Sequence, residues 1–176
     1  EIYEYINFIG DHESIAQFDS IKDQVIIVNG LSKGFAMTGY RLGYIAAHPT
    51  VAKACEKIQG QFTSGANAIT QRAAIVALTS DLRPTMDMTK EFTRRRERIL
   101  HLMNEIPNCD CANPDGAFYI FPNISSYFGK RIGENVIQNA DDLCMYLLND
   151  AHVSTVTGRA FGEPNCIRFS FANSME

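Results

Sequence analysis

The sequence predicts an α/β fold, in which short apolar strands and longer amphipathic helices follow one another. First, the short β-branched run at residues 24–28 suits a buried strand of a mostly parallel sheet. Second, a loop rich in glycine and other small residues follows it directly, which is where α/β proteins commonly bind a ligand. Third, an apolar segment at residues 44–47 leaves this loop, and apolar residues then recur at helical spacing from Val51 onward.

Composition limits the classes of function. The chain has 176 residues, of which 45% are hydrophobic and 20% charged, as in a globular protein with one core or two small ones. Its net charge of -4 argues against nucleic acid and anionic membranes as partners. No apolar run approaches the roughly 20 residues that span a bilayer. The sequence starts with none of the features of a signal peptide.

The cysteines point to the cellular compartment. The chain has 5 of them, and their spacing matches neither a zinc site nor a disulfide framework. We therefore expect no metal site. Free thiols are typical of a reducing compartment, so we expect a cytoplasmic protein.

The elements before residue 107 are predicted in order from local patterns. Residues 1–8 alternate imperfectly between apolar and polar side chains, which favours a strand that runs into a loop. Thr50 is a suitable N-cap for a helix over residues 51–61. A second, alanine-rich helix is predicted over residues 68–78, with its small residues in a core. A long helix over residues 84–106 carries a solvated run of charges, RRRER, before a proline ends it.

The remaining residues predict a separate, smaller domain. An Asn-Pro-Asp-Gly turn precedes an aromatic segment that has the composition of a strand. Two aspartates suit the start of a later helix. The predicted elements are a strand at 117–122, a polar loop at 125–139, a helix at 140–149, and strands at 153–156 and 167–172.

Two basic residues in the small-residue loop have the chemistry of a cofactor site. Lys33 can form an imine with a carbonyl compound, because a lysine amine is nucleophilic once it is desolvated or lies beside another cation. Arg41 supplies a planar and permanently charged fork that suits phosphate or carboxylate. Taken alone, Lys33 is most simply a surface lysine.

The pattern around these residues is more specific. Ser32-Lys33, followed by Thr38-Gly39-Tyr40-Arg41-Leu42-Gly43-Tyr44, closely resembles the lysine signature of class I/II aminotransferases, which use pyridoxal phosphate (PLP). The resemblance implies that Lys33 binds PLP and moves a proton during catalysis. It also implies that Arg41 holds the phosphate and that Ser32 is a minor phosphate contact. Gly30 stands where many relatives have serine, so one hydroxyl contact to phosphate is missing.

The resemblance extends to both ends of the chain. Tyr3 matches a tyrosine that binds the phenolic oxygen of PLP in this family. The aspartate that pairs with the pyridine nitrogen would fall before Glu1. Arg168 lies in an Arg-Phe-Ser-Phe-Ala segment whose arginine receives the substrate α-carboxylate, and the Gly-Ala-Phe-Tyr segment from Gly116 is also similar to the family.

The resemblance further implies a domain layout and an activity. Residues 1–85 are identified as the C-terminal part of a PLP-binding large domain with a mostly parallel sheet, and residues 86–107 as a linking helix. Residues 108–176 would be a small α+β C-terminal domain, truncated at its end. The parent protein would be a homodimer that transfers an amino group from an amino acid, most simply aspartate, to a 2-oxo acid such as 2-oxoglutarate. This fragment alone is expected to be inactive.

Three alternatives remain open from the sequence. A PLP-dependent lyase of the same fold would keep both Lys33 and Arg41. An aminotransferase-like effector domain of a transcription regulator would need a DNA-binding segment upstream. The chain could also be a noncatalytic folded fragment.

Overall fold

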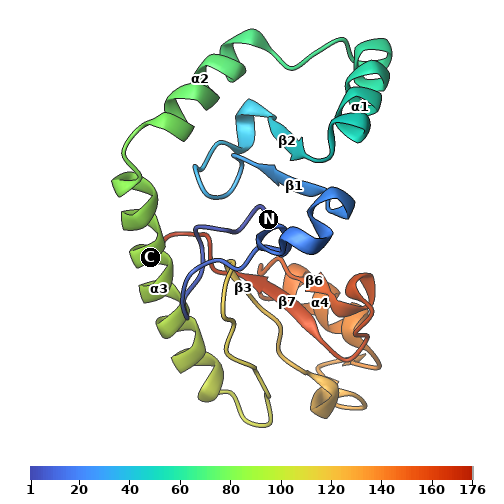
Figure 1. Cartoon of the computed structure of the whole chain (residues 1–176). Coiled ribbons are helices and arrows are strands. Elements are labelled where there is room, and N and C mark those ends of the chain that lie inside the picture. The colour runs from blue at the N-terminus through green and yellow to red at the C-terminus, as the bar shows by residue number, and fades with distance from the viewer. Residues whose placement is uncertain (176) are drawn as a thin grey trace. The chain divides into compact units, whose positions relative to one another are not determined.

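The computed structural model describes residues 1–175 and divides into two compact units, unit 1 at Glu1–Thr89 and unit 2 at Lys90–Glu176 (Figure 1). Helix α3, Arg83–Asn104, runs through this division. The domain boundaries that the family resemblance implies, near residues 85 and 107, stay predictions.

Unit 1 contains a two-stranded sheet, two helices and short 3-10 turns (Figure 1). Its elements are η1 (Ile15–Gln17), η2 (Asp19–Gln24), β1 (Ile27–Gly30), η3 (Thr38–Tyr40), β2 (Gly43–Ala46), α1 (Pro49–Phe62) and α2 (Ala68–Thr79). β1 and β2 pair antiparallel. The mostly parallel sheet expected from the sequence is not present within residues 1–175, where every strand pair is antiparallel. The segment joining β1 to β2 has no crossover helix, which parallel neighbours usually need.

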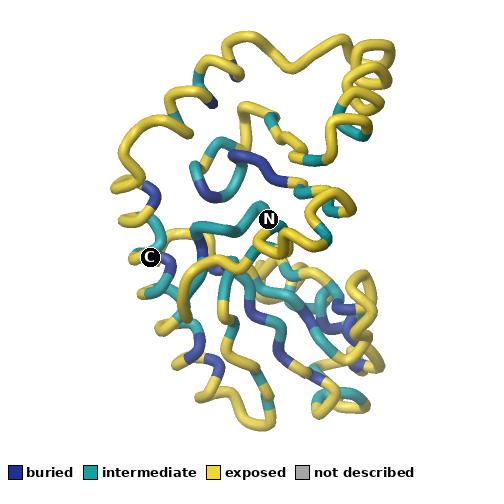
Figure 2. Tube along the Cα trace, in the orientation of Figure 1, coloured by how far each residue is buried: buried dark blue, intermediate teal, exposed yellow. Residues whose placement is uncertain are grey.

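The prediction that residues 24–28 form a buried strand is wrong. The Val28 side chain is 62% exposed, and only Asn29 and Gly30 at the end of β1 are buried (Figure 2). A two-stranded sheet has no third strand to extend it, and β1 and β2 pack mainly on each other. Residues 1–8 also differ from the prediction, because backbone hydrogen bonds from Glu4 N to Glu1 O (3.0 Å) and from Ile6 N to Tyr3 O (2.8 Å) fold them into turns.

The helices of unit 1 confirm the predicted pattern but not all of its details. α1 begins at Pro49, so His48 and not Thr50 is the N-cap; its Nδ1 accepts from the Thr50 N–H. Proline is common at the first helical position, because the N–H group that it lacks would have no hydrogen-bond partner within the helix there. In α2 the predicted core is small: Thr70 and Ala74 are buried, whereas Ile69 is 76% exposed.

The charged run of α3 only partly faces solvent. Arg94 is exposed and pairs with Glu91, as does Arg95, at 2.8 and 3.0 Å. Hydrogen bonds from Arg94 and then Arg95 lower the pKa of Glu91 to about 2. Arg95 also donates to the Ala172 carbonyl (3.0 Å) and Arg96 to the Pro114 carbonyl (2.7 Å), so part of the run anchors α3 within unit 2.

Unit 2 is a three-stranded antiparallel sheet with strand order β3-β7-β6, together with α4, a hairpin and two 3-10 turns. Its further elements are β3 (Tyr119–Ile120), η4 (Ser125–Tyr127), β4 (Arg131–Ile132), β5 (Asn135–Val136), α4 (Ala140–Asn149), β6 (Val156–Thr157), η5 (Gly158–Phe161) and β7 (Ile167–Ser170). α4 has the predicted bounds. The predicted loop at 125–139 contains η4 and the β4–β5 hairpin, and the strand expected at 153–156 begins only at Val156. Val153 instead donates its N–H to the Leu147 carbonyl of α4 (2.8 Å).

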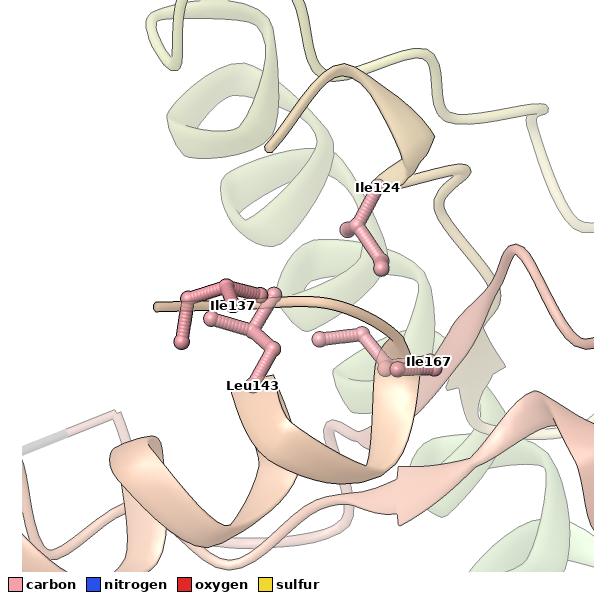
Figure 3. Close-up of a cluster of buried hydrophobic side chains, with 5 residues drawn as sticks. Ile124, Ile137, Leu143 and Ile167 are labelled. Carbon is pink, nitrogen blue, oxygen red and sulfur yellow. The ribbon is translucent and has the colours of Figure 1, made fainter. Parts of the chain in front are cut away.

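Branched aliphatic side chains form the core of unit 2. Ile137 and Ile167 are each 1% exposed, and they point toward Ile124 and Leu143 in the interior (Figure 3). Ala140, at the start of α4, completes this cluster. The core therefore joins α4 to β7, the strand that carries Arg168. No helix among residues 1–175 is both long and apolar enough to span a membrane.

We expect Gly158→Ala to lower the free energy of unfolding by about 3 kcal/mol, near the upper end of the usual cost of overpacking. A Cβ atom at Gly158 would lie 2.2 Å from the Glu163 carbonyl oxygen and 2.4 Å from that of Cys166. Both oxygens belong to the backbone of the same closed turn, so neither can move away cheaply. Chemical denaturation measures the loss.

Gly60→Ala is the matched control, since a Cβ there meets nothing within 4 Å and Gly60 lies inside α1. It should be neutral or stabilise by up to about 1 kcal/mol. Equal stability of the two variants would contradict the steric argument.

Candidate active site

The loop that carries the lysine, residues 31–42 between β1 and β2, is closed by its own backbone. Leu31, which is 1% exposed, donates its N–H to the Leu42 carbonyl (3.4 Å) and accepts from the Met37 N–H (3.2 Å). We call this segment the lysine loop. Lys33 lies in its first turn, half-buried, and its carbonyl accepts from the Ala36 N–H (3.1 Å). A buried leucine two positions earlier thus fixes the backbone from which the Lys33 side chain projects.

Two residues of the lysine loop have left-handed backbone conformations. Ala36 has φ 53° and Arg41 has φ 54°, values that non-glycine residues rarely adopt. The Arg41 guanidinium donates from Nη1 to the Thr38 carbonyl (2.9 Å), which ties the side chain to its own loop. Such backbone strain clusters at binding and catalytic sites, because the surrounding structure must hold it in place.

Close packing against the N-terminal segment explains two glycines, Gly30 at the end of β1 and Gly34 in the lysine loop. A Cβ at Gly30 would lie 3.0 Å from the Leu42 carbonyl and 3.2 Å from Ile2 Cδ1, so the serine common among relatives would be crowded here. A Cβ at Gly34 would lie 2.7 Å from the Tyr5 ring. Ile2 therefore lies against the end of β1, and Tyr5 lies against the lysine loop. Burial raises the pKa of Tyr5, which favours its neutral phenol.

Arg41 lines an open hollow of about 600 Å³ in unit 1. The start of α2 lines the same hollow through Asn67 and Thr70, and the Thr70 hydroxyl donates to the Tyr40 carbonyl (3.0 Å). The residues that line it, all within the described chain, include no carboxylate. The Asn67 side chain already accepts from the N–H groups of Ile69 and Thr70, so the group of this hollow that suits an anion such as a phosphate is the Arg41 guanidinium.

Arg168 lies in the other unit, on β7. Its neighbour Ile167 is fully buried, and Arg168 itself is half-buried. Ser32, Lys33 and Arg41 thus belong to one loop with the Tyr3 segment beside it, whereas Arg168 belongs to the other unit. The roles expected for these five residues stay predictions.

Sequence reasoning missed several side chains around these residues. Tyr5 packs edge-on against Phe35 of the lysine loop, with ring centroids 5.4 Å apart, and Thr70 joins α2 to that loop. No signal in the sequence marked Thr70. The proximity of Tyr5 to Tyr3 was the only hint of its place. In unit 2, the aromatic residues beside Arg168 were also missed.

Comparison with known proteins identifies the class. The model of the aminotransferase class I and II family matches residues 1–176, and the chain belongs to that family. A bifunctional aspartate aminotransferase and glutamate/aspartate-prephenate aminotransferase of Petunia hybrida is 45% identical over 99% of the chain and 38% of its own length. The aspartate aminotransferase of Bacillus subtilis is 36% identical over 100% of the chain and 44% of its own length.

The solved structures agree with the sequence relatives. The crystal structure of an aspartate aminotransferase from Rhizobium meliloti has a TM-score of 0.94 and 38% identity, covering 99% of this chain and 44% of that one. The α/β PLP-transferase fold is therefore established, and the family to which the chain belongs consists of PLP-dependent aminotransferases. The chain spans less than half the length of these relatives. Their names favour neither the lyase nor the regulator alternative.

Proposed function

We propose that this chain, as part of a longer polypeptide, transfers the amino group of aspartate to a 2-oxo acid such as 2-oxoglutarate. The observation that carries the proposal is the lysine loop, which combines the family signature with a buried anchor at Leu31 and strained backbone at Ala36 and Arg41. The relatives named as aspartate aminotransferases support the choice of amino donor.

In this proposal, each candidate site residue of the chain has its own role. The Lys33 amine would hold the cofactor, and as a free amine it would take the proton from the substrate Cα. PLP supplies an electron sink for the charge that this proton leaves behind. Arg41 would hold the phosphate with its guanidinium, Ser32 would add a minor contact from the same loop, and the Tyr3 hydroxyl would donate to the phenolic oxygen of the cofactor.

Arg168 orients the substrate. A guanidinium binds a carboxylate through two parallel hydrogen bonds, which fixes the direction of the substrate as well as its charge. That direction matters, because the bond broken at Cα must stand perpendicular to the cofactor ring. The half-buried position of Arg168 on β7, next to a core residue, supports this role.

The proposal also concerns the parts of the protein outside this chain. We propose that a mostly parallel sheet and a homodimer interface are completed by residues outside it, and that the chain alone does not catalyse transamination. The exposed apolar side chains of Val28 and Ile69 support such further packing. We also propose that the chain includes a small α+β C-terminal domain. The free thiols support a location in the cytoplasm, and the net charge of -4 supports the absence of nucleic-acid and membrane partners.

The deciding experiment is an amino-transfer assay of the full-length protein that contains this chain. Aspartate with 2-oxoglutarate should be the best pair, ahead of alanine and phenylalanine as donors. The 176-residue chain, assayed in parallel with added PLP, should show no turnover. Turnover by the chain alone would refute its dependence on other segments, and a full-length protein inactive with all three donors would refute transamination.

We expect Arg41→Gln to raise the dissociation constant of PLP about 10- to 100-fold, the usual value of a charge-assisted hydrogen-bond pair. Glutamine keeps a polar side chain but removes the charge and the planar fork, and it is shorter than arginine. Titration of the full-length apoenzyme by absorbance measures the change. Arg83→Gln, at an exposed arginine elsewhere in unit 1, is the control and should bind PLP as the wild type does. Equal affinities for the two variants would remove Arg41 from the phosphate site.

A further inference from the structure

The guanidinium of Arg168 lies between two aromatic rings. Its Cζ atom is 4.4 Å from the centroid of the Tyr119 ring and 4.5 Å from that of Phe161. Both distances are well inside the roughly 6 Å limit for an attractive cation–π contact. We call Tyr119 and Phe161 the guanidinium clamp.

The sheet places the first ring. Tyr119 on β3 stands opposite Ser170 on β7, so Arg168, two positions before Ser170, is its diagonal neighbour on the same face. Diagonal neighbours are close enough for a long side chain to lie across an aromatic ring. Register alone therefore brings Arg168 and Tyr119 together.

A closed turn places the second ring. Phe161 ends η5, and the turn closes through hydrogen bonds from Gly158 N to Cys166 O (2.8 Å) and from Glu163 N to Gly158 O (3.0 Å). An ion pair from Arg159 to Asp141 (2.8 Å) ties the same turn to α4. The position of Phe161 thus depends on a segment with little freedom to move.

Further aromatic residues support each ring of the clamp. Phe121 meets Phe161 edge-on at a centroid distance of 6.0 Å and an interplanar angle of 87°. Phe118, which is buried, contacts Tyr119 at 4.8 Å. Phe161 itself is 48% exposed, so one side of its ring is open to solvent.

The clamp leaves the hydrogen-bonding edge of Arg168 available. Arg94, Arg95 and Arg159 all pair with carboxylates of unit 2, whereas no carboxylate within residues 1–175 pairs with Arg168. Ring contacts use the flat faces of a guanidinium, and its five N–H donors lie in its plane. The arginine is therefore held in place without using its donors.

We propose that Tyr119 and Phe161 are positioning residues that hold Arg168 ready for the substrate carboxylate. The inference rests on the proposed function, in which Arg168 binds that carboxylate. An arginine ordered before binding loses less side-chain freedom when the substrate arrives, so the clamp acts on affinity for the amino acid.

Kinetics of the full-length protein test this role. Tyr119→Leu and Phe161→Leu should each raise KM for aspartate about 5- to 20-fold, the value of one desolvated cation–π contact with its ordering, and change kcat less than about 2-fold. Tyr119→Phe and Phe161→Tyr keep the rings and should retain wild-type KM. Phe62→Leu, at an 84% exposed phenylalanine of α1, is the control and should change nothing. Unchanged KM in both leucine variants would overturn the proposal, as would a Tyr119→Phe variant as impaired as Tyr119→Leu.

A spectroscopic measurement on the 176-residue chain separates the clamp from the proposed function. Ring currents should shift the Arg168 side-chain proton resonances upfield, and the shift should shrink in each leucine variant while the denaturation midpoint stays unchanged. Absence of the shift in the wild-type chain would overturn the clamp. If the shift is present but the full-length protein transaminates no donor, the proposed function fails and so does the assigned role in carboxylate binding, although the packing stands.

Discussion

Replacing Lys33 by alanine should lower kcat/KM for transamination by at least about 10⁴-fold in the full-length protein, because one amine supplies both the covalent link and the proton transfer. The absorbance of the covalently bound cofactor should disappear as well. Lys33→Arg should be equally inactive, since a guanidinium keeps its proton at every relevant pH and cannot act as nucleophile or base. Retention of charge therefore cannot rescue activity, which separates the chemical role of Lys33 from an electrostatic one.

The structure predicts that these variants fold normally. Lys33 is half-buried in a turn that is held by the buried Leu31 and by backbone hydrogen bonds, which an alanine or an arginine at this position leaves in place. Denaturation midpoints of the wild-type and variant chains should agree. Lys53→Ala, at an exposed lysine of α1, is the matched control and should keep full activity. Activity within about 100-fold of the wild type in Lys33→Ala would exclude Lys33 as the principal general base.

Helices were the most predictable part of the fold, because periodicity records which face is buried. α4 appears with the predicted bounds, and α2 and α3 differ from prediction by a residue or two. Strands were less predictable, since a strand is defined by its partner. Val153 was expected in a strand, yet its N–H bonds to α4 and pairing begins only at Val156. The prediction of a buried strand at residues 24–28 was wrong for the same reason, because composition does not reveal how many strands a sheet has or what covers it.

The candidate site shows the same division between local and distant information. The spacing of Lys33 and Arg41 lies within one loop, so a local motif was enough to single them out. The contacts of Tyr5 with Gly34, and of Phe161 with Arg168, join segments far apart along the chain or depend on a closed turn. Gly30 is instructive, because its departure from the family pattern looked like a lost phosphate contact. The structure gives it a steric reason, since the Leu42 carbonyl leaves little room for a side chain.

The second large effect is expected at Arg168. Arg168→Ala should lower kcat/KM about 10²- to 10³-fold, in the range measured when one partner of a hydrogen-bonded charge pair is removed. Arg168→Lys keeps the charge but loses the planar fork, so it should recover only a part of this loss. Arg131→Lys, at an exposed arginine of β4, is the control and should match the wild type.

Comparison of amino donors tells which carboxylate Arg168 binds. Every amino acid has an α-carboxylate, so an arginine that receives it must affect aspartate, alanine and phenylalanine by the same factor. An arginine that instead binds the side-chain carboxylate would impair aspartate alone and leave the other two donors unchanged. Equal losses in kcat/KM across the three donors are therefore the expected result for Arg168→Ala. A loss confined to aspartate would mean that Arg168 binds the side-chain carboxylate and selects the substrate, and does not bind the α-carboxylate.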